Sequence, residues 1–209
     1  MNLEYLNKFC ANKANDAREK LWKPFIQGGY AIATNGAIAV RVNLSGIDHG
    51  RTDRSANDTW PNVNKRIEEV KTGGMGEFDA FACLELIPLP ELPPAEPCHF
   101  CDGTGKAYRC DECDGVGDFE HGNHLYDCKE CGGCGQLGYG EGEAVSCMEC
   151  AGLGEKPYCP VKVGNASFDR RFLALIAPLP NVMIAPNGTE KAAYFQFDGG
   201  DGALMPMRY

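Results

Sequence analysis

The chain has 209 residues, a formal net charge of −9 at pH 7 and twelve cysteines. This length suits one ordinary domain plus a small module. Most of the negative charge lies in residues 98–159, which makes that segment a poor candidate for contact with DNA, and the rest of the chain is close to neutral. The N-terminal residues show no basic start followed by an apolar run, and no stretch reaches the ~20 apolar residues of a membrane span, so a cytoplasmic location is expected.

The N-terminal part predicts a helix, a hairpin and a loop. Apolar residues recur at helical spacing from Leu3 to Leu21, which predicts one amphipathic helix. Two short strands are expected on either side of Asn35-Gly36, a pair typical of tight hairpins. Residues 43–77 predict a polar loop with a short helix near 64–71, and another strand is expected at 78–87.

The C-terminal part predicts a similar order of elements. A strand is expected at 158–164, and a helix is expected to begin with Ser167 as its N-cap and to stop before Pro178. Three further strands are expected at 181–186, 191–200 and 202–208. Because each flank is a helix leading into antiparallel strands, the sequence predicts one discontinuous α+β domain, residues 1–97 and 160–209, interrupted by an insert at 98–159.

The insert at 98–159 differs in composition from both flanks. It holds ten of the twelve cysteines, half of the 26 glycines, and twelve Asp and Glu against four Lys and Arg. Five prolines between Pro88 and Pro97 form an extended lead-in. Few apolar residues remain for a core, so bound metal is expected to supply the stability that burial cannot.

The pattern Cys-x-x-Cys-x-Gly-x-Gly occurs four times in the insert. A tetrahedral Zn²⁺ takes four thiolates, and each Cys-x-x-Cys supplies two of them from one tight turn. The glycines allow the chain to turn back with backbone N–H groups facing the sulfurs. Two zinc ions are therefore expected as cofactors. The predicted ligands are Cys98, Cys101, Cys110, Cys113, Cys128, Cys131, Cys147 and Cys150.

Other uses of the cysteines remain open at this point. A redox-active Cys-x-x-Cys normally accompanies a βαβ unit, which the pattern lacks. An iron–sulfur cluster could use Cys128, Cys131 and Cys134, with Cys159 before a proline, but it would leave the other motifs without metal. Three histidines could replace a thiolate but are expected in exposed loops: His99, His121 and His124. Two further cysteines are expected in the apolar core, Cys10 and Cys83.

The four motifs resemble the cysteine-rich zinc domain of DnaJ-type chaperones, over residues 98–154. In that family the first and fourth motifs share one zinc, and the second and third share the other. The resemblance implies one ion at Cys98, Cys101, Cys147 and Cys150, and a second ion at the other four cysteines. Only eight residues separate Cys101 from Cys110, so the spacing would also allow the first two motifs to share an ion. The His-Pro-Asp triplet of a full co-chaperone is absent from the sequence.

The flanks resemble one domain of the bacterial sliding clamp, the processivity ring of replicative polymerases. The clamp's C-terminal end has a helix opening Phe-x-x-x-Tyr-Leu, then strands, then Met-Pro-Met-Arg. The matching residues here are Phe168, Phe172 and Leu173, and Met205, Pro206, Met207 and Arg208. Ala33, Thr34, Asn35 and Gly36 are similar to the clamp's Ala-Thr-Asp-Gly hairpin.

The clamp resemblance implies a partner-binding site. In clamps this hairpin and the C-terminal tail border a cleft that captures short peptides, which implies such a role for Thr34 and Gly36 and for the tail, Met205, Pro206, Met207 and Arg208. Here a single domain carries both walls. By analogy, the two walls are expected to meet only where two chains pack head to tail, as in a homo-oligomer.

Two function classes follow from these patterns. The first is a non-enzymatic zinc-binding interaction protein of DNA replication or phage–host conflict, which acts through the clamp-like domain on a replication or host-defence protein. The second is a chaperone-like protein that binds unfolded polypeptide through its zinc module. No enzymatic activity is expected, because all-thiolate zinc sites are closed and no paired acid and base occur at catalytic spacing. Direct DNA contact by the acidic insert is not expected. If a phage encodes the protein, its location is the bacterial host cytoplasm.

Overall fold

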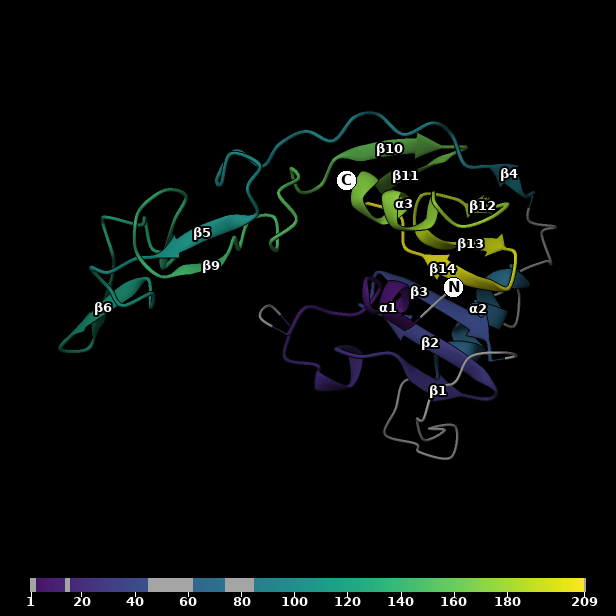
Figure 1. The fold of residues 1–209 in the computed structure, drawn as a ribbon, viewed down its shortest axis with the longest axis horizontal. Coiled ribbons are helices and arrows are strands. Elements are labelled where there is room, and N and C mark those ends of the chain that lie inside the picture. The colour runs from purple at the N-terminus through teal and green to yellow at the C-terminus, as the bar shows by residue number, and fades with distance from the viewer. Residues whose placement is uncertain (1–2, 14–15, 45–61, 74–84, 209) are drawn as a thin grey trace. The chain divides into compact units, whose positions relative to one another are not determined.

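A computed structural model describes residues 3–13, 16–44, 62–73 and 85–208. The chain forms two compact units (Figure 1). The first comprises Met1–Pro93 and Pro160–Tyr209, and the second comprises Pro94–Cys159. In the described residues the fold is mixed, with mostly antiparallel sheets and few helices.

The first unit is built on one antiparallel sheet of seven strands (Figure 1). Across the sheet the order is β1 (Phe25–Gln27), β2 (Tyr30–Thr34), β3 (Ile38–Asn43), β14 (Gly200–Leu204), β13 (Lys191–Phe197), β12 (Met183–Asn187) and β4 (Ile87–Pro88). The N-terminal and C-terminal strands meet at β3 and β14, where Val40 lies opposite Gly202. The two flanks of the insert therefore complete a single sheet.

One face of this sheet holds the larger apolar core. It packs against α1 (Leu3–Asn7), α3 (Arg170–Ile176) and the hairpin of β10 (Pro160–Val163) and β11 (Ala166–Asp169). Side chains alternate along a strand, so Ile38, Val40 and Val42 of β3 all point into this core. Burying one such side chain contributes about 1.5–3 kcal/mol.

The opposite face of the sheet carries α2 (Val63–Lys71). Val63, Ile67 and Val70 lie on one side of the helix at helical spacing and pack against the sheet. Asn62 caps the start of the helix, and its side-chain oxygen accepts the N–H of Lys65 at 3.0 Å. This cap satisfies one of the backbone donors that a helix start leaves free.

The expected helix from Leu3 to Leu21 is wrong in its length. Helix α1 ends at Asn7, and a short 3₁₀ helix covers Glu19–Leu21. Between them the Asp16 carboxylate accepts the backbone N–H of Arg18 at 2.8 Å, a local bond that competes with helical hydrogen bonding. The apolar spacing instead reflects burial, because the N–H of Ala11 bonds to the carbonyl of Leu21 at 2.9 Å and both side chains enter the interior.

Other expected elements agree with the structure to different degrees. The hairpin around Asn35-Gly36 is confirmed as β2 and β3, and the short helix near 64–71 as α2. Most of the strand expected at 78–87 lies outside the described residues. Strand β4 begins at Ile87, the last residue of that expected strand. The strand expected at 202–208 ends at Leu204, because Pro206 has no N–H to continue a ladder.

The expected start of the second helix is also corrected. Ser167 lies in β11, and the N-cap of α3 is Asp169, whose carboxylate accepts the N–H of Arg171 at 2.9 Å. Because Ser167 pairs with Lys162 in the β-hairpin, the helix begins later in the chain than expected. Aspartate caps a helix as well as serine does. The helix stops before Pro178, as expected.

The second unit contains short strands and no helix along its whole length. Three strands form one small sheet in the order β8 (Gln136–Leu137), β5 (Lys106–Arg109) and β9 (Ala144–Ser146). Two further strands, β6 (Asp118–His121) and β7 (His124–Asp127), form a separate hairpin. Its buried residues are mainly the cysteines, so metal ligands take the place of a conventional core.

Candidate metal centres and a candidate binding groove

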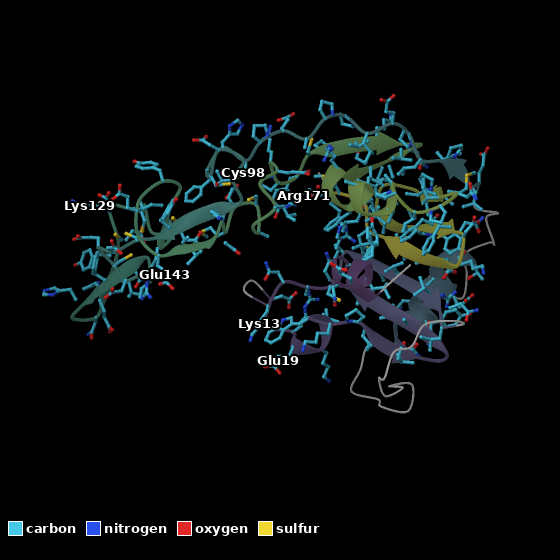
Figure 2. All side chains as sticks on the ribbon, in the orientation of Figure 1. Lys13, Glu19, Cys98, Lys129, Glu143 and Arg171 are labelled. Atoms are coloured by element: carbon cyan, nitrogen blue, oxygen red, sulfur yellow. The ribbon has the colours of Figure 1, made fainter. Side chains whose placement is uncertain are left out.

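The eight cysteines of the four motifs form two groups in the second unit. One group is Cys98, Cys101, Cys147 and Cys150, and the other is Cys110, Cys113, Cys128 and Cys131. Within each group the four sulfurs lie within 4.8 Å of one another, and all but Cys131 are buried. In Figure 2 the yellow sulfur atoms gather at two places in this unit, one of them beside the labelled Cys98. The structure thus groups the first motif with the fourth, and the second with the third.

The sulfur spacing fits a tetrahedral zinc ion at each group. The Sγ–Sγ distances are 4.0 Å for Cys98–Cys147 and 3.8 Å for Cys101–Cys150. In the other group they are 3.9 Å for Cys110–Cys128 and 3.8 Å for Cys113–Cys131. A tetrahedron with Zn–S bonds of about 2.3 Å has edges of roughly 3.8 Å, whereas a disulfide is only about 2.05 Å long. The two groups therefore fit two zinc sites.

The backbone of each motif donates hydrogen bonds to its second cysteine. The N–H of the second glycine points at that sulfur in all four copies. The N–Sγ distances are 3.3 Å for Gly105–Cys101, 3.2 Å for Gly117–Cys113, 3.1 Å for Gly135–Cys131 and 3.2 Å for Gly154–Cys150. Such donors stabilise a thiolate and therefore hold a metal ligand in its reactive form.

The thiol pKa values show the effect of these donors. Burial opposes ionisation of Cys101 and Cys131, but the N–H groups of their glycines and the neighbouring thiols outweigh it and lower the pKa of each to about 7. Burial raises the pKa of Cys110 and of Cys147 to about 12. Each group of four cysteines can therefore be partly ionised without a metal ion. Four thiolates so close together repel one another, so full ionisation requires a bound cation.

The pairing of motifs is fixed by reciprocal backbone contacts. At the first group the N–H of Cys98 bonds to the carbonyl of Gly154 at 2.9 Å, and that of Cys147 bonds to Gly105 at 3.0 Å. Gly105 has φ +71°, and a Cβ there would collide with the carbonyl oxygen of Gly152. The second group repeats this arrangement, with Cys110 bonded to Gly135 at 3.0 Å and Cys128 bonded to Gly117 at 2.8 Å. Glycine is thus needed both for the turn and for the close approach of the paired motif.

The other candidate ligands lie outside both groups. The Cys134 thiol is 2.9 Å from the carbonyl oxygen of Cys131, a position that the Thr104 hydroxyl occupies in the first motif, at 2.7 Å from Cys101. Cys134 is therefore a turn residue. Among the described residues, no group combines it with the other sulfurs that the iron–sulfur alternative needs. The remaining candidates divide as follows: His99, His121 and His124 are exposed, Cys10 is half-buried against the core, and Cys83 lies outside the described residues.

Three of the six predicted partner-binding residues line one groove in the first unit. Thr34, Gly36 and Met205 border a cavity of about 830 Å³ beside α2. Its other lining residues are Arg18, Leu21, Ala37, Ile38, Ala39, Asn62, Val63, Lys65, Arg66, Val70, Ala192 and Ala203. The remaining predicted residues lie elsewhere: Pro206 is buried, Arg208 is exposed and the N–H of Met207 bonds to Ser167 at 2.8 Å.

The hairpin and the tail meet within a single chain, contrary to the expectation that two chains are required. The N–H of Met205 bonds to the carbonyl of Ala37 at 2.8 Å, because β14 pairs directly with β3. Hydrogen bonds of the Thr34 side chain close the turn. The Thr34 hydroxyl donates to the carbonyl of Ile38 at 2.7 Å and accepts the N–H of Gly36 at 3.1 Å. The Thr34 hydroxyl is therefore engaged in shaping the groove wall.

The groove is apolar inside and cationic at its rim. The alanines of the sheet, Ala39 and Ala203, leave a hollow opposite Val63 of α2. Three of the lining residues are cations, Arg18, Lys65 and Arg66, and none of the lining residues is acidic. All three cations are exposed and also pair with acidic neighbours outside the lining. Such a surface suits a peptide in which an apolar residue lies next to an acidic residue.

A buried arginine that the sequence analysis did not single out fixes α2 to the sheet. Arg41 is 4% exposed, and its guanidinium donates to the Asp201 carboxylate at 2.6 and 2.9 Å and to Glu68 of α2 at 2.5 Å. The Tyr194 hydroxyl donates to the same Asp201 carboxylate at 3.0 Å. Burial, followed by the Asp201 charge, raises the pKa of Tyr194. In the sequence, Arg41 is a charged residue within the apolar pattern of β3, and this could have indicated a buried ion pair.

Comparison with known protein families, with curated proteins and with solved structures returned no match to this chain. In the described part of the chain, no helix combines the length and apolar character needed to cross a membrane.

Proposed function

We propose that the protein is a non-enzymatic, zinc-binding interaction protein that captures a short peptide segment of a partner protein in the groove beside α2. The observation that supports this most directly is the single groove bordered by Thr34, Gly36 and Met205. These residues come from two distant parts of the sequence, and they are three of the six residues for which the clamp resemblance implies partner binding.

The chemistry of the groove favours an apolar peptide with an acidic flank. A Leu or Phe side chain placed against Ala39, Ala203 and Val63 would gain about 1.5–3 kcal/mol from burial. The thioether of Met205 adapts to different side-chain shapes. Each exposed ion pair at the rim would add about 0–1 kcal/mol, and would select for Asp or Glu beside the apolar anchor.

The biological setting rests on the resemblance to sliding clamps. A clamp-like domain that binds peptides would act on a replication protein or on a host-defence protein, in DNA replication or in phage–host conflict in a bacterial cytoplasm. The zinc sites have a structural role in this proposal, because a closed site of four thiolates has no open coordination position for substrate or water.

A second candidate function is chaperone-like binding of unfolded polypeptide by the DnaJ-type zinc module. One observation favours it: among the described residues, the large apolar side chains that are exposed all lie in the second unit. They are Val116, Phe119, Leu125, Tyr126, Tyr139, Met148, Leu153 and Tyr158. Apolar surface of this kind marks interaction sites.

Calorimetric titration with two ligands separates the two functions. The first ligand is a peptide with a Leu-Phe pair between aspartates, and the second is a reduced, carboxymethylated and permanently unfolded protein. In Ala203→Leu the groove is filled, whereas Ala203→Ser keeps its size. We expect Ala203→Leu to weaken peptide binding by about tenfold or more, and Ala203→Ser to change it by less than about threefold. Equal peptide binding by both variants would contradict the groove, and binding of the unfolded protein alone would favour the chaperone-like function.

A further inference from the structure

The β6–β7 hairpin is the most exposed regular element of the second unit. Its strands pair only with each other among the strands of the described residues, and every residue in them except Asp118 is exposed. In Figure 1 no other strand of this unit runs alongside it. A two-stranded ribbon is marginally stable by itself, and both of its outer edges present unpaired backbone groups.

The second metal centre anchors the base of this hairpin. The N–H of Gly117, just before β6, points at the sulfur of Cys113 at 3.2 Å. The N–H of Cys128, just after β7, bonds to the carbonyl of Gly117 at 2.8 Å. Both ends of the ribbon are therefore tied to zinc ligands. The hairpin is therefore fixed at its base, and the rest of its surface is accessible to a partner protein.

The two faces of the hairpin differ in chemistry. Phe119 lies opposite Tyr126, and His121 lies opposite His124, so four ring side chains share one face. The rings of His124 and Tyr126 approach edge to face, with centroids 6.4 Å apart. Phe119 is 41% exposed and Tyr126 is 53% exposed. The other face carries Leu125 and the acidic residues Asp118, Glu120 and Asp127.

The surroundings of the hairpin are strongly acidic. Seven Asp and Glu but only one Lys occur between residues 110 and 131. Four thiolates around one Zn²⁺ would add further negative charge. Such a surface repels nucleic-acid phosphates and anionic lipid headgroups. It attracts lysine and arginine side chains, so charge complementarity favours a basic protein segment as the occupant.

We propose that the β6–β7 hairpin docks an extended segment of a partner protein in which apolar residues alternate with Lys or Arg. The segment adds as a third strand to an open edge of the ribbon, where backbone hydrogen bonds provide affinity. Alternation then places its apolar side chains beside Phe119 and Tyr126, and its basic side chains beside Glu120 on the other face. This surface lies in the second unit, so the inference is independent of the groove beside α2.

The test uses the zinc-loaded full chain and a fluorescent peptide, Lys-Val-Lys-Phe-Lys-Val-Lys with blocked ends. Anisotropy titrations compare it with the same peptide N-methylated at alternate residues, which keeps charge and apolar surface but cannot pair along one edge. We expect N-methylation to weaken binding by about tenfold or more, since strand addition depends on those N–H groups. Equal binding of the two peptides would overturn the proposal, because it would reduce the contact to charge attraction alone.

Protein variants provide a second arm of the test. Phe119→Ser combined with Tyr126→Ser removes the two large aromatic side chains of that face, and Leu125→Ser is the matched control because Leu125 is 70% exposed on the opposite face. We expect about tenfold weaker binding for the double variant and less than about threefold for the control. Zinc content, measured on every variant, reports folding. Undiminished binding by a zinc-loaded double variant would overturn the proposal. The peptide comparison on the unmodified chain decides the matter if the variant loses metal.

Discussion

Replacing Gly154 by alanine should weaken the first metal centre and leave the second intact. Gly154 has φ +75°, and a Cβ there would collide with the carbonyl oxygen of Gly103 in the paired motif. The left-handed backbone costs about 1–2 kcal/mol for alanine, and overpacking against a fixed carbonyl costs about 1–3 kcal/mol. The sum is about 2–5 kcal/mol. In a unit that folds around its metal this strain reduces zinc affinity, by roughly 30-fold to several thousandfold.

The matched control is Gly132→Ala. Gly132 also has a positive φ, of +63°, but a Cβ there would meet nothing within 4 Å. The fourth motif already carries Ala151 at the equivalent position, with φ +54°. Only the conformational cost of about 1–2 kcal/mol should therefore apply, and only to the second centre.

Competition with a zinc chelator, followed by elemental analysis, measures both variants. Gly154→Ala should release one of two ions at a chelator concentration at which Gly132→Ala still retains both. If the two variants lose zinc equally, the contact between paired motifs does not control affinity. If adding Gly154→Ala to Cys101→Ser makes the one remaining ion easier to remove, Gly154 belongs to the same centre as that ion and the grouping of the motifs is wrong.

Two more predictions concern the cysteines and the buried arginine. Cys101→Ser and Cys113→Ser should each retain one zinc ion, and the double variant should retain none, because the two cysteines belong to different groups. Elemental analysis measures the zinc content. One ion in the double variant would show instead that the first two motifs share a site. Arg41→Met should lower the free energy of unfolding in urea by about 3 kcal/mol, because it leaves the Asp201 carboxylate without its charged partner. A loss below about 1 kcal/mol would mean that water and the existing hydrogen bond from Tyr194 are enough to stabilise the carboxylate.

Elements set by short-range rules could be predicted from the sequence. The hairpin at Asn35-Gly36 follows from residues that favour a tight turn, and the periodic apolar face of Val63, Ile67 and Val70 indicates α2. The eight thiol ligands follow from the motif, since each Cys-x-x-Cys and its glycines form the same local turn in all four copies. These features depend on neighbours within a few residues, which the sequence displays directly.

Only the tertiary structure decided which distant segments meet. The four motifs have nearly the same local geometry, so nothing within a motif selects its partner; the reciprocal contacts of Gly105 with Gly152 and of Gly154 with Gly103 do so. The groove depends likewise on the pairing of β3 with β14, which brings Met205 to Ala37 across the insert. The end of α1 at Asn7 depends on the burial of Ala11 and Leu21 together. Periodicity records which side chains are buried, but burial is possible in more than one backbone conformation, and the packing of distant elements selects among them.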